Sequence, residues 1–340
     1  DLGAYQTTVP STISIGINKY NANGSQLMYS TYFGGTFGKI YPNSLRVTSN
    51  NELVMTGYTE STTMPVTAGA YQPTLHGSSD MYVVKFNAAG SALVGSTYLG
   101  GSGAESYVMN VIYFTPFAPS NYSMSAVDLA FDKQENIWIA GNSSSTDFPV
   151  TPGAIQPLLK GGHDAIVVRL NPALTALQYG SYLGGSAWDG INGIEYDPNG
   201  DRIAVAGSTI SSDFPITPGA YKPTRPGGRL DGFVTVINTN TAPSLLASSY
   251  LGTDTTDFAV RVAFDCSSNV YVSGNTKGNY PVTNAVGQGL IANGCIFIDK
   301  LNATLTSSLA STRTGISVSS FLGDNIPASM IVDRCGNLTI

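Results

Sequence analysis

Acidic residues recur at one position of the sequence, shortly after a Gly-Gly or Gly-Thr pair. They are Glu105, Asp189 and Asp257, and Lys39 stands at the corresponding place near the start of the chain. A ring of carboxylates around the mouth of a channel would bind a cation or the hydroxyl groups of a sugar. The alternative is a structural role, in which each acid accepts backbone N–H bonds where a strand begins. The recurrence of the acids with the surrounding unit favours the structural role.

A second set of acids, Asp80, Asp164 and Asp231, directly precedes predicted strands, and the same structural interpretation applies to it. Aromatic residues lie nearby: Trp188 directly precedes Asp189, and five more fall within residues 107–124. Flat rings stack on sugars, but they also pack loops onto neighbouring strands, and we favour packing. If the chain has a ligand site on this side, we expect it to consist of Trp188, Asp189, Glu105, Tyr107 and Asp257.

Support for catalysis is weak. The two histidines, His76 and His163, have no evident nucleophile or metal-binding partner. A glycoside hydrolase needs two carboxylates in different environments, whereas the acids here recur with the repeat. Residues 197–201 superficially resemble a calcium loop, but they lack the bidentate glutamate of such loops and are better explained as a hairpin turn. We therefore expect no catalytic residues, no bound metal and no cofactor.

The composition narrows the class of protein. Charged residues make up 11% of the 340 residues, and the balance of 16 basic against 22 acidic residues gives a net charge of -6. We see no basic stripe of the kind that nucleic-acid binding requires. No apolar run is long enough to span a membrane. The abundance of Gly, Ser, Thr and Asn is poor for helices and suits short strands and turns, as in many secreted proteins.

A tag that contains Tyr and ends in Gly-Gly recurs along the chain and defines a repeat. The corresponding residues of the successive tags are Tyr32, Tyr98, Tyr182, Tyr250 and Arg313, which are 66, 84, 68 and 63 residues apart. The longest spacing contains about 18 extra residues, which we place at 107–124.

Each repeat predicts four short strands. Residues 193–197 and 202–206 flank Pro-Asn-Gly, and residues 165–170 and 176–183 flank Asn-Pro, as expected for two hairpins. Four antiparallel strands per unit, repeated several times, are typical of propeller blades. We predict an all-β fold, a β-propeller of five four-stranded blades that forms a single domain over residues 1–340.

The two ends of the chain carry complementary halves of one blade, because the start matches the linker before a third strand and the end enters a second strand. We predict that the halves pair and close the ring, which would remove two exposed sheet edges. We also expect the chain to be part of a longer protein. The predicted units are a half-blade at 1–35, repeats at about 36–101, 102–185, 186–253 and 254–315, and a half-blade at 316–340.

The three cysteines occupy different parts of the predicted blades. Cys266 and Cys335 stand at the same turn of successive units, and Cys295 stands where other units carry the acid before the third strand. These places are too far apart for the Cα separation that a disulfide requires. We predict no bridge among the three cysteines.

Several motifs resemble a known bacterial repeat. They are Ser-Thr-Tyr-Leu-Gly-Gly at 96–101, Asp-Ala-Ile-Val-Val-Arg-Leu-Asn at 164–171, and Asp-Phe-Pro followed by Thr-Pro-Gly-Ala-Tyr at 213–221. These residues are similar to the SBBP β-propeller repeat. The turn at 333–337 also resembles large surface or secreted proteins of Bacteroidetes that are associated with gliding motility. The resemblance implies a propeller fold and a location outside the cell, and it implies no catalytic residues.

The direction of the strands sorts the connections onto two faces. The tight turns lie on one face, and the long linkers, the Gly-Gly segments and the insertion at 107–124 lie on the other. Loops on a rigid scaffold commonly carry binding surfaces. We expect a non-catalytic extracellular or cell-surface scaffold or adhesion module that binds a protein or a surface glycan through the long loops. Other domains of the same longer chain are further expected partners. A carbohydrate-binding propeller is the alternative, followed by a glycoside hydrolase or lyase.

Overall fold

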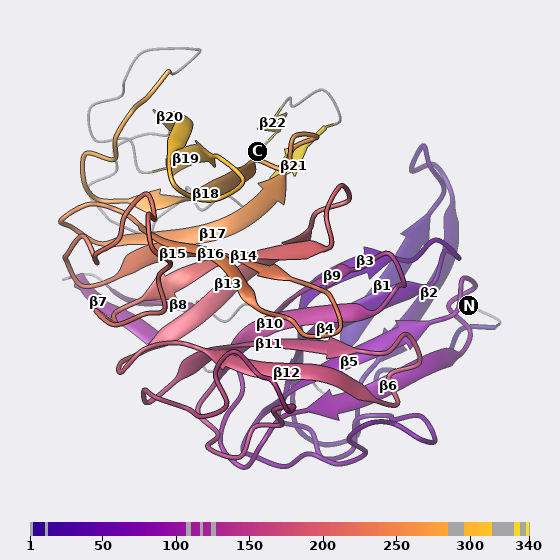
Figure 1. Ribbon diagram of the computed structural model, residues 1–340. Coiled ribbons are helices and arrows are strands. Elements are labelled where there is room, and N and C mark those ends of the chain that lie inside the picture. Colours follow the sequence, from indigo (N-terminus) through magenta and orange to yellow (C-terminus); the bar gives the residue numbers. More distant parts are fainter. Residues whose placement is uncertain are drawn as a thin grey trace.

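Short β-strands make up all the regular structure of the described residues, which are 3–10, 13–106, 110–115, 118–123, 127–284, 296–314, 330–333 and 338–339 of the computed structural model (Figure 1). None of these residues forms a helix that could cross a membrane.

Four sheets contain four strands each, and every sheet is an antiparallel meander in which consecutive strands are neighbours. Their strands are β3 (Ile40–Val47), β4 (Leu53–Thr59), β5 (Asp80–Phe86), β6 (Leu93–Leu99); β9 (Asp128–Phe131), β10 (Ile137–Ser143), β11 (Asp164–Leu170), β12 (Leu177–Leu183); β13 (Asp189–Tyr196), β14 (Arg202–Thr209), β15 (Asp231–Asn238), β16 (Leu245–Leu251); β17 (Asp257–Phe264), β18 (Val270–Thr276), β19 (Ile296–Leu301) and β20 (Ser308–Thr314). Three hairpins complete the set: β1 (Ile15–Tyr20) with β2 (Leu27–Phe33), β7 (Asn110–Thr115) with β8 (Ala118–Ser123), and β21 (Ile331–Val332) with β22 (Leu338–Thr339).

The sheets follow one another around a common centre (Figure 1). The first strand of each sheet contacts the first strand of the next, from β3 to β9, β13, β17 and β21. Each pair of neighbouring sheets encloses its own apolar cluster, for example that of Trp138, Ile194 and Phe233 between the second and third sheets. Because most sheets are covered on both faces, their central strands are buried almost throughout. This arrangement is that of a β-propeller and confirms the predicted fold class.

The strand directions confirm the division into two faces. Tight turns join β9 to β10 and β11 to β12 on one side, which we call the tight-turn face. The other side, the long-loop face, contains the linkers that lead into β5, β11 and β15. It also contains the Gly-Gly segments that follow β6 and β12 and the Gly-Thr segment that follows β16. The β7–β8 hairpin lies in the predicted insertion between β6 and β9. Tyr107 lies outside the described residues.

The hairpin turns are stabilised by aspartates. The carboxylate of Asp265 accepts backbone N–H bonds from Ser267 at 2.9 Å and Asn269 at 2.8 Å. Asp197 accepts the N–H of Asn199 at 2.9 Å and forms an ion pair with Arg202 at 2.8 Å. The segment at 197–201 is therefore a hairpin turn, as predicted.

The two ends of the chain differ from the predicted closure. The β1–β2 hairpin packs against the first complete sheet and the β21–β22 hairpin against β17, but the two hairpins form separate sheets in the described part of the chain. In the part of the chain that the structure describes, the predicted fifth blade is thus present as two separate hairpins, each packed against the blade beside it. One consequence is an open groove of about 680 Å³ between β1 and β3, where Leu45 and Val47 are exposed.

Cys266 is exposed in the turn between β17 and β18. Cys295 and Cys335 lie outside the described residues, so the absence of a bridge among the three remains a prediction.

Candidate functional site on the long-loop face

The tyrosine of each repeat tag anchors the long linker of its own blade. The hydroxyl of Tyr98 accepts the N–H of Met64 at 3.0 Å and donates to the carbonyl of Ser61 at 2.8 Å. Tyr250 makes the same pair of bonds with the N–H of Phe214 and the carbonyl of Ser211. These rings are fully buried, so each hydroxyl bond fixes the linker against the outermost strand. The tag is thus a structural element of the repeat.

The first glycine of the tag lies between two buried carboxylates. A Cβ on Gly100 would lie 2.4 Å from Glu105 Oε2 and 2.5 Å from Asp80 Oδ1, so the two oxygens are less than about 5 Å apart. A Cβ on Gly184 would meet Asp164 and Asp189 in the same way, at 2.7 and 2.8 Å. No side chain other than hydrogen fits these positions.

Gly252 stands at the same place between Asp231 and Asp257. Each of the three blade junctions therefore holds a pair of acids, one at the start of a third strand and one at the start of the next blade. All six acids are 0% exposed.

In two of the junctions a glutamine connects the acid to the glycine. The amide of Gln156 donates to Asp164 at 2.6 Å, and its oxygen accepts the N–H of Gly184 at 2.9 Å. Gln72 bridges Asp80 and Gly100 in the same way, at 2.7 and 2.9 Å. The glutamine thus locks the long linker, the third strand and the Gly-Gly segment together.

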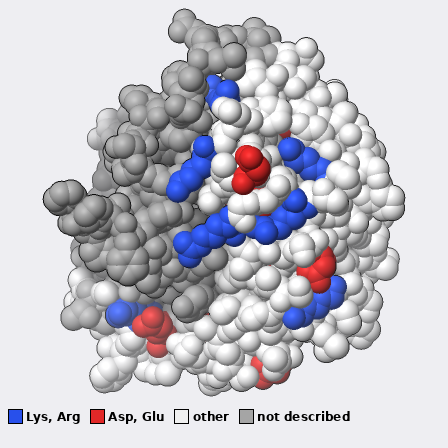
Figure 2. All heavy atoms as spheres, turned by 90° about the vertical axis from the view of Figure 1, so that its left-hand side faces the viewer, with Lys and Arg blue, Asp and Glu red and all other residues white. Residues whose placement is uncertain are grey.

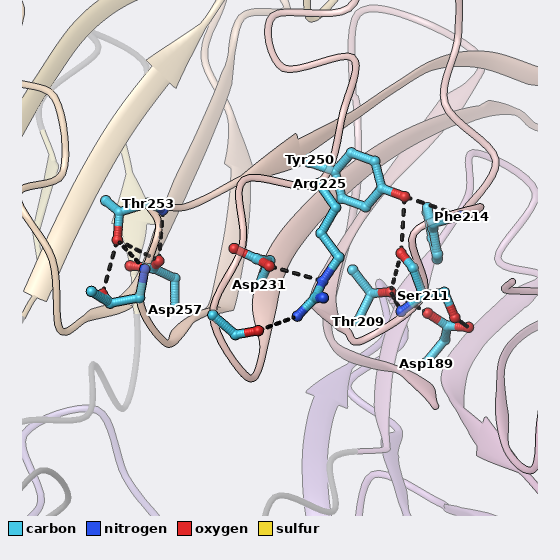
Figure 3. A network of polar contacts seen from close by, with 11 residues as sticks. Asp189, Thr209, Ser211, Phe214, Arg225, Asp231, Tyr250, Thr253 and Asp257 are labelled. Atoms are coloured by element: carbon cyan, nitrogen blue, oxygen red, sulfur yellow. Dashed lines mark hydrogen bonds and ion pairs between the residues drawn. The ribbon is translucent and has the colours of Figure 1, made fainter. Parts of the chain in front are cut away.

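The second acid of each pair accepts bonds from its own blade. Asp189 accepts the hydroxyl of Ser211 at 2.8 Å, that of Thr209, and the N–H of Gly185 at 2.7 Å (Figure 3). Glu105 accepts the hydroxyl of Ser143 at 2.7 Å together with a backbone N–H. The structural role expected for these acids is confirmed.

Burial raises the pKa values of these carboxyl groups. The pKa of Asp189 is raised to about 6 because the group is desolvated, and donated hydrogen bonds offset this only in part. Burial likewise raises the pKa of Glu105 to about 7, with a smaller contribution from the charge of Asp80. The pKa values of Asp80 and Asp164 are raised in the same direction by burial.

The third junction uses different residues for the same purpose. Lys222 stands in place of the glutamine, and Arg225 pairs its Nε with Asp231 at 2.9 Å (Figure 3). Burial raises the pKa of Asp231 to about 7, although the charge of Arg225 acts in the opposite direction. Asp257 accepts the N–H and the hydroxyl of Thr253 at 2.6 and 2.8 Å. This junction therefore carries positive charge where the other two carry an amide.

Trp188 is buried, with 8% of its surface exposed, and packs in an apolar cluster with Leu230, Phe258 and Val260. Trp188 therefore packs as we favoured from the sequence, and it lacks the exposure over a groove that stacking on a sugar requires. The physical reason is that the strand start turns this side chain inward, towards the next blade. Glu105, Asp189 and Asp257 are likewise inside the junctions.

The histidines lie beside the junction acids, because His76 donates its backbone N–H to Asp80 at 3.0 Å and His163 accepts the backbone N–H of Asp189 at 2.9 Å. The side chain of His76 is exposed in its linker, and that of His163 is partly buried, which lowers its pKa. A cavity of about 250 Å³ lies beside His76 and Asp147, between the first two complete blades. Lys39 is exposed. The described residues contain no group of three or more metal-ligating side chains.

The sequence analysis did not identify Gln72 and Gln156 as bridges between the aspartate and the glycine of their junctions. Both follow a Gly-Ala pair and one large apolar residue, Tyr71 or Ile155, and precede their aspartate by eight residues. That constant spacing was a usable signal. It pointed to a polar contact across the linker, which the periodicity of the strands alone does not reveal.

The meander sheets around a common centre and their buried junctions define a β-propeller. Residues 248–281 match the family model of the SBBP β-propeller repeat. The comparison with curated proteins found no match.

Several solved structures are similar over most of the chain. A gluconolactonase from Xanthomonas campestris is 10% identical with a TM-score of 0.39, over 88% of this chain and 69% of the other. A protein of unknown function from Dyadobacter fermentans is 13% identical with a TM-score of 0.39, over 85% and 67%. A quinohemoprotein alcohol dehydrogenase from Pseudomonas putida is 10% identical with a TM-score of 0.37, over 88% and 57%. These values carry no argument about activity.

Proposed function

We propose that the chain is a non-catalytic β-propeller scaffold of an extracellular or cell-surface protein, and that it binds a partner protein or a surface glycan through its long-loop face. The main support is the contrast within each blade junction. The paired acids are buried and hold the frame, whereas the linkers above them differ in charge and polarity from blade to blade. A rigid frame with variable loops on one face suits recognition.

The burial of the junction acids supports a non-catalytic role. A glycosidase needs one carboxyl group that protonates the leaving group and a second that reaches the sugar. The six junction acids have no exposed surface, and a glycine backbone separates the two members of each pair. These acids have no access to a sugar, although the pKa values of Glu105 and Asp231 are near neutrality.

The proposal is tested on a glycan array and on a panel of surface proteins, with one variant for each face. Leu158→Glu with Thr224→Glu changes exposed residues of the long-loop face. Leu246→Glu with Leu309→Glu changes exposed residues near the tight turns and serves as the matched control. We expect binding that the first variant loses and the second retains. Loss in the second variant only, or no binding by the wild type, would contradict the proposal, and so would release of reducing sugar from any arrayed glycan.

A further inference from the structure

Positive charge collects on two loops of the third blade junction. The linker before β15 carries Lys222, Arg225 and Arg229, and the loop after β18 carries Lys277. Both loops are bonded to the same segment, because Leu230 accepts the N–H of Asp257 at 2.8 Å and Lys277 donates its own N–H to Thr256 at 3.0 Å. Residues 253–256 therefore run between two basic loops.

Two of these cations lie beside each other. Partial burial lowers the pKa of Lys277, and the nearby charge of Arg229 lowers it further. Both residues are exposed. Like charges held at close range in the folded chain raise the local potential, and an anion on the surface would relieve their repulsion.

The preceding junction shows that this charge is not required by the repeat. Ile210 donates its N–H to Trp188 there, in the same contact that Lys277 makes with Thr256. The apolar pair of the second junction is thus replaced by a threonine and a lysine in the third. Asp213, which accepts the N–H of Ser186 at 2.8 Å, corresponds to Asn279 in the third junction.

One acid near the basic loops, the buried Asp231, pairs with Arg225 at 2.9 Å. Asp254 is the exposed acid of residues 253–256, while Asp231 and Asp257 are buried beneath the surface and have raised pKa values. Figure 2 faces this side of the molecule and shows Lys and Arg side chains gathered around an acidic one. A protein with a net charge of -6 thus carries a local basic patch.

We propose that this basic patch, formed by Lys222, Arg229 and Lys277 above the Arg225–Asp231 ion pair, binds an acidic polysaccharide. The proposal rests on the proposed function, because it names the ligand class of the long-loop face. Arg229 offers a planar fork for a carboxylate or sulfate group. The hydroxyls of Thr253 and Thr255, which lie 3.0 Å apart between the basic loops, suit the hydroxyl groups of a sugar.

The distribution of charge favours a polysaccharide over a nucleic acid. Duplex DNA carries one charge per about 1.7 Å and is bound by a long basic stripe. Here the cations are confined to one junction, and the neighbouring junctions present the exposed acids Asp147 and Asp213, which would repel a continuous phosphate backbone. A sugar polymer with charges spaced more widely fits a short patch flanked by hydroxyl groups.

The experiment compares the affinities of four probes at low ionic strength: dextran sulfate, polygalacturonate, uncharged dextran and a single-stranded oligonucleotide. We expect the wild type to bind at least one acidic polysaccharide, and Arg229→Ala with Lys277→Ala to weaken that binding by about tenfold or more. Lys160→Ala, which removes an exposed lysine from the preceding linker, should change it by less than about twofold. Circular dichroism and unfolding curves check that every variant is folded.

The outcomes separate this inference from the proposed function. Three results would overturn the proposal that the basic patch binds an acidic polysaccharide. They are equal binding of dextran and dextran sulfate, tighter binding of the oligonucleotide, and equal loss of binding in the Lys160 and Arg229/Lys277 variants. If the array shows a neutral ligand or a protein on the long-loop face while both acidic polysaccharides fail to bind, the proposed function stands and this inference is wrong. Preference between the two acidic probes identifies sulfate or carboxylate as the recognised group.

Discussion

The linkers before β11 and before β15 occupy the same place in successive blades, and each ends at a buried aspartate. In the first, Gln156 bridges Asp164 and the Gly-Gly backbone with two short hydrogen bonds. In the second, Lys222 replaces the glutamine and Arg225 pairs with Asp231. A neutral amide therefore ties the first linker to its acid, whereas an ion pair ties the second.

The difference shows that each repeat keeps the contact between the linker and its buried acid, although the residue that makes the contact changes. Each linker must be tied to the buried acid pair, but either an amide or an ion pair performs this task. Where basic residues replace the glutamine, as in the third junction, the surface above the junction is basic. The contact that holds each linker to the buried acids can thus be kept while the charge of the surface above it changes. Substitutions in the two linkers test this independence.

The largest effect is expected where the two junction acids approach the backbone. Gly184→Ala would place a methyl group 2.7 Å from the carboxyl carbon of Asp164, and we expect a loss of about 3 kcal/mol in the free energy of unfolding. Gly162→Ala is the matched control, because a Cβ there has no atom within 4 Å. Urea unfolding of both variants measures the contrast, and similar losses would mean that the acid pair is not closely packed against Gly184.

The next effect separates the two linkers directly. Gln156→Ala leaves a buried carboxylate and the N–H of Gly184 without their partner, so we expect a loss of about 2 kcal/mol in the free energy of unfolding. Lys222→Ala removes a half-buried ammonium group that lies 5.7 Å from the Tyr221 ring centre, and it should cost less than about 1 kcal/mol. A larger loss for Lys222→Ala would show that the lysine carries the structural contact.

A smaller effect should appear in the pH dependence of stability. Burial raises the pKa of Glu105 to about 7 and that of Asp189 to about 6, above their values in the unfolded chain. The folded state then binds more protons than the unfolded state at intermediate pH. This stabilisation is complete at a pH below the pKa values of the unfolded chain. It is lost as the pH rises through the pKa values of the folded protein. Tm should therefore be about 3 °C higher at pH 5 than at pH 7.5.

Other groups at the junctions set the limits of this effect. The pKa of His163 is lowered by burial, so its protonation opposes the gain below about pH 6.5, and Arg225 favours the ionised form of Asp231. The hydrogen bonds from Ser102 lower the pKa of the exposed Asp147. Its contribution to the stability of the folded state is therefore lost only at a pH below this range. Asp189→Asn should reduce the slope between pH 5 and pH 7.5, and an unchanged slope would assign it to other groups.

The propeller fold could be predicted because the same sequence motifs recur in successive units of the chain. Tags, turn aspartates and linker motifs recur in phase, and each occurrence corrects errors in the others. The sequence left sugar stacking open as the alternative for Trp188, because its burial depends on Leu230 and Phe258 of the neighbouring blade, which lie far away in sequence. The basic patch escaped notice for a similar reason: Arg229 and Lys277 become neighbours only when two loops meet at residues 253–256.

The central claim is that the buried junctions hold the frame while the loops of the third junction alone carry the anion-binding surface. The most direct test is the affinity for the acidic polysaccharide, dextran sulfate or polygalacturonate, that the wild type binds more tightly, measured for Arg229→Glu and for Lys160→Glu. Both substitutions reverse an exposed cation on corresponding linkers of successive blades. We predict that Arg229→Glu weakens binding by about tenfold or more and that Lys160→Glu changes it by less than about threefold. Equal effects of the two substitutions, or none from Arg229→Glu, would contradict the account.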